Sequence, residues 1–195
     1  MPFYLGLDLG QTTDPSVAVI LEAQDERPKR FYAIRHIESY PLGTSYPAII
    51  KAVGALLDRS PLRGDCTLVI DQTGVGRAIF DMFVEATLTP VGITITPGKL
   101  WHQEEPRQFH VAKELLVGTV QKFLQSGRLR SSARVPHSQV LRNELQAFRV
   151  TMTKAANEVY GPDVRESAHD DMVLACAVAL WYAEHPPPEY NIRRL

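Results

Sequence analysis

Three segments rich in Val, Ile, Leu, Phe and Tyr follow one another within the first 40 residues, at positions 3–9, 16–22 and 30–38. They are separated by the turn-prone GQTTDP and by the charged QDERPK, and neither linker has room for a helical crossover. Strands joined by such short connections pair antiparallel. The first 40 residues therefore predict a three-stranded antiparallel meander.

Beyond residue 45 the apolar period changes, and helix-type and strand-type segments alternate. The predicted elements are a helix over 46–60, a strand over 66–71, a helix over 74–86, a strand over 91–97, a long helix over 106–127 that ends at Gly127, a helix from Pro136, a loop or short hairpin over 150–168, and a helix over 170–184. This order predicts an α/β fold with a five-stranded mixed sheet, three antiparallel strands followed by two parallel ones, and helices on both faces.

A chain of 195 residues with 45% hydrophobic residues suits one domain, which we expect over residues 1–185, followed by a flexible tail at 186–195. The longest apolar run, Met172–Tyr182, is too short to span a bilayer, and the first residues do not resemble a signal peptide. Cys66 and Cys176 lie inside apolar elements, as reduced thiols do. We therefore expect a cytoplasmic protein, in the host cytoplasm if a phage encodes it.

Asp8 interrupts the apolar run FYLGLDLG, where an unpartnered carboxylate would be costly to bury. Asp71 ends the apolar segment CTLVID in the same way. If the two strands are parallel neighbours, both carboxylates lie at one edge of the sheet, about 4.8 Å apart. Two carboxylates that close raise each other's pKa unless a cation lies between them. The pair is therefore a candidate half of a metal site.

The last apolar helix begins with a further acidic pair, Asp170 and Asp171, directly after His169. Acids at a helix N-terminus also stabilise the helix dipole, and Ser167 or Asp170 could simply be the cap. Taken with the two strand aspartates, however, the cluster offers the hard oxygen ligands that Mg²⁺ and Mn²⁺ prefer. The combination therefore predicts a divalent-metal site formed by these aspartates.

The net charge of −1 conceals a basic segment between Arg107 and Lys154, which has nine basic residues against two acids. Such a segment is typical of a DNA-binding surface, although it could equally consist of solvated helix faces. Within and near it, the candidate DNA contacts are Arg77, Lys122, Arg128, Arg130, Arg134 and Arg142, of which Arg128, Arg130 and Arg134 are preferred.

The sequence TGVGR follows Asp71 and opens a predicted helix. Gly74 and Gly76 would let backbone N–H groups approach a phosphate at the helix N-terminus. A tight turn from strand to helix requires the same glycines, so both interpretations remain open.

Four segments in this order, LGLDLGQTTDPSVAVI, TLVIDQTGVGRAIFDMF, LLVGTVQKFLQSGRLR and HDDMVLACAVALW, resemble the nuclease domain of phage terminase large subunits. That domain belongs to the RNase H-like group, which includes Holliday-junction resolvases and retroviral integrases. The resemblance extends from Leu5 to about Tyr182. It implies an endonuclease that cuts double-stranded DNA with two Mg²⁺ or Mn²⁺ ions, in which Asp8, Asp71 and Asp171 are the catalytic metal ligands. His169 and Asp170 are second candidates near the same metals.

The same resemblance implies a role in viral DNA packaging, with a separate packaging ATPase and a portal as partners. The chain contains no G-x-x-x-x-G-K-[ST] loop, whereas a terminase large subunit carries an ATPase motor before its nuclease. The chain would then be an excised domain or a stand-alone nuclease.

Three other functions fit parts of the pattern. A Holliday-junction resolvase would share the fold and the acidic residues. GLDLGQTTD also resembles the first phosphate loop of the actin and sugar-kinase group, but a second phosphate loop and an adenosine motif are not evident. A non-catalytic DNA-binding or assembly module would not need the three aspartates.

Overall fold

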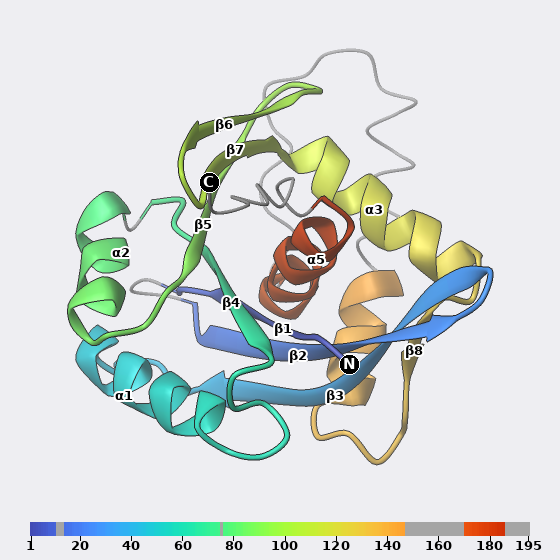
Figure 1. Ribbon diagram of the computed structural model, residues 1–195, viewed down its shortest axis with the longest axis horizontal. Helices are drawn as coiled ribbons and strands as arrows, with labels where there is room; N and C mark the ends of the chain where they lie inside the picture. The colour runs from blue at the N-terminus through green and yellow to red at the C-terminus, as the bar shows by residue number, and fades with distance from the viewer. Residues whose placement is uncertain (11–13, 75, 147–169, 186–195) are drawn as a thin grey trace, which may run out of the picture.

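The computed structural model describes residues 1–10, 14–74, 76–146 and 170–185, and in this part of the chain one mixed sheet carries helices on both faces (Figure 1). The eight strands lie in the order β6-β7-β5-β4-β1-β2-β3-β8. Their bounds are β1 Phe3–Asp8, β2 Ser16–Glu26, β3 Lys29–Tyr40, β4 Cys66–Asp71, β5 Val91–Thr96, β6 Trp101–Glu105, β7 Gln108–Ala112 and β8 Leu129–Ser131. The helices are α1 Tyr46–Leu57, α2 Gly76–Glu85, α3 Lys113–Gln125 and α5 Asp171–Glu184, and residues 138–146 are also helical.

The predicted middle of the sheet is confirmed. β1 pairs antiparallel with β2, and β2 pairs antiparallel with β3. β4 lies parallel to β1 on its other side, and β5 lies parallel to β4. The helices predicted from residues 46, 74 and 136 are also present, with boundaries shifted by a few residues at most. The segment 150–168 and the tail 186–195 lie outside the described residues.

The prediction of five strands was wrong, because three further strands extend the sheet. The segment 106–127 is not one helix: β7 occupies its beginning and α3 starts only at Lys113. In β7, Phe109 and Val111 alternate with half-buried His110, which is the period of a strand. β6 is a polar, largely exposed edge strand, and β8 has three residues, so neither has the apolar pattern that predicts a strand.

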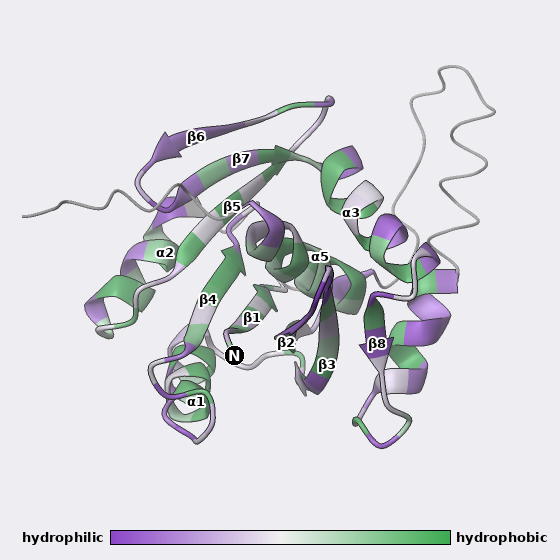
Figure 2. Ribbon diagram, turned by 45° about the vertical axis from the view of Figure 1, so that its right-hand side comes forward, coloured by the Kyte–Doolittle hydropathy of each residue, from purple (hydrophilic) through white to green (hydrophobic). Residues whose placement is uncertain are grey.

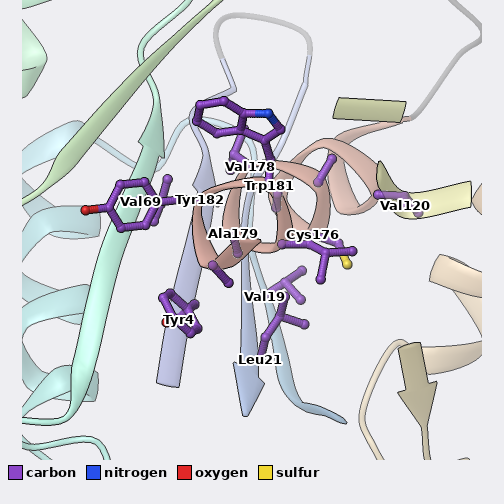
Figure 3. Packing of buried hydrophobic residues seen from close by; sticks show 14 of the residues in the cluster. Tyr4, Val19, Leu21, Val69, Val120, Cys176, Val178, Ala179, Trp181 and Tyr182 are labelled. Carbon is purple, nitrogen blue, oxygen red and sulfur yellow. The ribbon is translucent and has the colours of Figure 1, made fainter. Parts of the chain in front are cut away.

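α5 covers one face of the sheet together with α3. Its residues are buried almost without interruption from Met172 to Ala183, and it packs on Tyr4, Val19, Leu21 and Val69 of the central strands (Figure 3). A β-carbon placed on Gly6 of β1 would come within 1.9 Å of the carbonyl oxygen of Ala175. Glycine at position 6 is therefore what lets α5 lie directly on β1.

α1 and α2 cover the other face, where they pack on the alternate residues of the same strands (Figure 1). Leu5, Leu7 and Ile70 belong to this second core, with Val53 of α1 and Phe83 of α2. Figure 2 shows the central strands and α5 as the most continuously hydrophobic part of the molecule. No helix within the described ranges is both long and apolar enough to cross a membrane.

Candidate carboxylate site

Asp8 and Asp71 end two neighbouring parallel strands, and their Cα atoms are partners in the register. Gly6 faces α5, so Asp8, two residues further along β1, projects to the same face. Val69 belongs to the core under α5, which places Asp71 on that face as well. Because adjacent strands are about 4.8 Å apart, the two carboxylates lie side by side at the rim of the sheet.

Asp170 and Asp171 reach the same rim from α5. Ala175 contacts Gly6. Asp171 is one helical turn before Ala175, and Asp8 is two residues beyond Gly6, so both residues lie on the same side of this contact, toward the rim. The electrostatics agree with this placement, because the charges of both Asp170 and Asp171 raise the pKa of Asp8. His169, the remaining candidate ligand, lies outside the described residues.

Burial and mutual repulsion dominate the electrostatics of the site. The pKa of Asp8 is well above its usual value, first because the side chain is buried and then because Asp71, Asp171, Asp170 and Asp14 surround it with negative charge. Burial likewise raises the pKa of Asp71 to about 6, although its carboxylate accepts a hydrogen bond of 2.8 Å from the backbone N–H of Thr73. The protein thus concentrates negative charge where water is largely excluded.

Glu144 is a further acid at this site, and the sequence interpretation missed it. It comes from helix 138–146 and accepts a hydrogen bond of 3.1 Å from the backbone N–H of Met172, in the first turn of α5. Burial, together with the charges of Asp171 and Asp170, raises its pKa to about 7. In the sequence, Glu144 was only one of the two acids in the basic segment, and that segment gave no reason to place it beside α5.

Lys113 was missed as well. Its Nζ donates to Oδ2 of Asp170 at 3.2 Å, and its charge lowers the pKa of Asp71. The erroneous helix over 106–127 hid this residue, because it placed Lys113 in the middle of a helix instead of at the junction between β7 and α3.

The donor set is suited to a hard cation. Its members are carboxylates, which are the ligands that Mg²⁺ and Mn²⁺ prefer, and a divalent cation would relieve the repulsion that now raises the pKa of Asp8. Within the described residues, no group of three or more His, Cys, Asp or Glu side chains is already arranged as a metal site. The carboxylates match a metal in their chemistry and in their shared position at the rim, but a bound ion would have to draw them closer together.

The turn after Asp71 has the backbone of a tight connection. Gly74 has a φ of 77°, which a residue with a β-carbon rarely adopts, and α2 begins at Gly76. Arg77, in the first turn of α2, donates from both Nη atoms to the carboxylate of Glu105 at 2.9 Å. Phosphate binding by this loop and by Arg77 stays a prediction.

Arg130 lies at the opposite end of the sheet from the carboxylates. It pairs with Ala33 of β3, Ala33 pairs with Glu22 of β2, and Glu22 pairs with Phe3 at the beginning of β1. Phe3 is five residues before Asp8, which corresponds to about 16 Å along a strand. The structure therefore does not bring Arg130 to the rim that holds the aspartates.

The arginines of β8 and its preceding turn pack on aromatic rings. The guanidinium carbon of Arg128 lies 4.0 Å from the ring centre of Phe123, and that of Arg130 lies 3.8 Å from the ring centre of Phe31. Arg130 also pairs with Glu26 at 3.1 Å. The contacts of Arg128 with Phe123 and of Arg130 with Phe31 are of the cation–π type, and they give both arginines a structural role.

The other basic candidates are spread over the surface. Lys122 is nine residues beyond Lys113 on α3, which is about 14 Å along a helix. Arg134 and Arg142 are exposed, the latter on helix 138–146. A DNA-binding role for all of these residues stays a prediction.

Neither a family model nor a curated protein sequence matches the chain. Solved structures do match. The large terminase nuclease from the thermophilic phage G20c is 20% identical, with a TM-score of 0.60, over 94% of this chain and 82% of that one. The human cytomegalovirus terminase nuclease domain is 15% identical, with a TM-score of 0.53, over 93% of this chain and 82% of that one.

Both similarities extend over nearly the whole of this chain. The resemblance predicted from the sequence is thereby confirmed for the architecture, with eight strands in place of five. The chain has the fold of viral terminase nuclease domains.

Proposed function

We propose that the protein is a metal-dependent endonuclease that hydrolyses phosphodiester bonds of double-stranded DNA. The observation that carries the proposal is the pairing of Asp8 with Asp71 in register, with Asp170 and Asp171 at the same rim. The charged forms of four carboxylates in largely buried surroundings repel one another, and bound divalent cations would offset this repulsion. The similarity to two viral nucleases of the same fold supports this choice of chemistry over ATP binding.

Asp8, Asp71 and Asp171 would hold two ions, Mg²⁺ or Mn²⁺, with Asp170 and His169 as further candidate ligands. Such ions supply Lewis-acid stabilisation of the leaving 3′ oxygen and lower the pKa of the attacking water. Asp8 would be the central ligand of the set, because it ends β1 beside Asp71 of β4 and on the face that α5 covers. Asp71 is oriented by the N–H of Thr73, and Asp171 is oriented by the packing of α5 on Gly6.

DNA would approach the rim where these carboxylates lie, and basic residues of the 107–154 segment that lie toward that rim would be sequence-independent phosphate contacts. By analogy of fold, we further propose that this cutting activity serves viral DNA packaging together with a separate ATPase and a portal. A protein that works on viral genomes in this way would act in the host cytoplasm.

The test is plasmid cleavage with a matched pair of variants. Supercoiled plasmid is incubated with the protein in Mg²⁺, Mn²⁺ or EDTA, beside Asp8→Asn and the control Asp65→Asn. Asp65 is exposed and precedes β4, at the end of the sheet opposite the carboxylates. We expect nicked and linear products with either metal, none in EDTA, a loss of at least about 100-fold for Asp8→Asn, and normal cleavage by Asp65→Asn.

Full activity of Asp8→Asn, or cleavage that persists in EDTA, would contradict the proposal. A second pair of substrates, a four-way junction and a linear duplex of the same sequence, separates a packaging-type nuclease from a resolvase. Cleavage restricted to the junction would favour the resolvase.

A further inference from the structure

Lys113 stands at the border between β7 and α3, and its Nζ reaches Asp170 at the carboxylate rim. Along the parallel strands, Asp71 is level with Ile93 of β5, and Ile93 is level with Phe109 of β7. β7 continues for three more residues to Ala112, which is about 10 Å beyond the level of Asp71. The first residue of α3 is therefore carried past the rim, on the side from which DNA would approach.

The ammonium group of Lys113 lies within the field of the acids but remains free to turn. Nζ contacts Oδ2 of Asp170 at 3.2 Å and lowers the pKa of Asp71, yet 49% of the lysine side chain is exposed, against 19% of that of Asp170. A lysine carries three donors on a flexible stem and behaves as a point charge. One bond to Asp170 thus leaves donors for a second acceptor.

The predicted DNA contacts are less suited to this position. Arg77 has both Nη atoms engaged by Glu105, and Arg130 lies at the far end of the sheet, next to Glu26 and Phe31. Lys113 combines a position at the rim with an exposed positive charge, whereas the sequence interpretation only counted it among the basic residues of the 107–154 segment.

We propose that Lys113 binds a DNA phosphate next to the position of cleavage, exchanging its contact with Asp170 for a phosphate oxygen. This inference rests on the proposed nuclease function. Its main alternative is that Lys113 only neutralises Asp170 and never contacts DNA. The two roles predict different results when both residues are replaced. If Lys113 only neutralises Asp170, it is no longer needed once Asp170 is neutral; if Lys113 binds phosphate, DNA binding still needs it.

The experiment measures duplex binding at several salt concentrations in the presence of Ca²⁺, with the DNA checked afterwards to be intact. The variants are Lys113→Met, Lys113→Arg, Asp170→Asn, the double variant Lys113→Met/Asp170→Asn, and the control Lys51→Met. Lys51 is an exposed lysine of α1, on the opposite face of the sheet. Cleavage by the same variants is measured in Mg²⁺.

Losing one phosphate contact should weaken binding by roughly five- to tenfold at about 0.1 M salt and make the salt dependence shallower by about 0.9. We expect this for Lys113→Met and equally for the double variant, with slower cleavage by both. Lys113→Arg should restore the slope, Asp170→Asn should bind at least as tightly as the parent, and Lys51→Met should change neither the affinity nor the slope.

The inference is overturned if Lys113→Met leaves affinity and slope unchanged, or if the double variant regains the parent's affinity. It is also overturned if Lys51→Met weakens binding as much as Lys113→Met, because the effect would then reflect total charge. A parent protein that binds DNA but does not cut it would contradict the proposed function, while the salt slopes would still decide the role of Lys113.

Discussion

At the scale of single residues, Asp8 is the carboxylate that interrupts the apolar first strand. The structure places it at the end of β1, at the rim of the sheet, and not beside a neutralising side chain. Asp8 lies at the end of β1 among other acids, and the main influences on its pKa all raise it. The charged form of such a residue lowers the stability of the metal-free protein at neutral pH. Function and stability are therefore opposed at this position.

We predict that Asp8→Asn stabilises the metal-free protein while it abolishes cleavage. Because the folded-state pKa of Asp8 is raised, its charged form is disfavoured by folding, and an amide removes that cost at about pH 8. Thermal unfolding in EDTA should show a higher Tm for Asp8→Asn than for the parent, and Asp65→Asn should show no gain. A lower Tm for Asp8→Asn would mean that the carboxylate stabilises the apo protein.

At the scale of elements, the decisive contact is the one between β1 and α5. Gly6 brings the backbone of the strand against Ala175, and this contact sets Asp171 opposite Asp8 (Figure 3 shows the same helix packed on Val19 and Val69). The helix is apolar on all sides, so hydrophobic burial alone does not fix its rotation. Close packing at Gly6 supplies the missing constraint.

We predict that Gly6→Ala destabilises the protein by about 3 kcal/mol or more, because the new methyl group would meet the backbone of Ala175, which cannot give way as a side chain can. Gly118→Ala in α3 is the control, since its β-carbon would meet nothing within 4 Å and alanine favours helix by about 1 kcal/mol. Denaturant unfolding of both variants checks this. A Gly6→Ala variant as stable as the parent would show that α5 can move off β1 without loss of stability.

Sequence reasoning succeeded for elements whose period is distinct and failed at the edges of the sheet. Asp8 and Asp71 could be placed together because two apolar strands ending in aspartate, joined by a helical crossover, allow parallel pairing in register. β6 and β7 could not be found, because polar WHQEE has no alternation and QFHVA runs directly into α3. Lys113 was lost with that boundary, and Glu144 depended on a contact between distant segments.

At the scale of the whole molecule, the raised pKa values of the carboxyl groups couple stability to pH and to metal. Asp71 has a pKa of about 6 and Glu144 a pKa of about 7, both above the values these side chains have when unfolded. The folded state therefore retains protons that the unfolded state has already released, so its stability falls as pH rises through these values. For Asp71 the loss amounts to about 3 kcal/mol at most.

We predict that in EDTA the Tm declines between about pH 5 and pH 8, and that Mg²⁺ raises the Tm at pH 8 much more than at pH 5. Differential scanning calorimetry across this range measures both effects. The double variant Asp71→Asn/Glu144→Gln should show a flatter profile and a smaller response to Mg²⁺. A parent profile that rises with pH in EDTA would be incompatible with this account.

The placement of α5 also governs when the site can exist. Asp8 belongs to β1 and is translated well before Asp170 and Asp171, which begin the last helix that the structure describes. The rim of the sheet can be completed only after that helix has been synthesised and inserted against Gly6. A nascent chain therefore carries an incomplete acidic cluster, and the proposed cleavage activity would arise only once translation has passed Glu184.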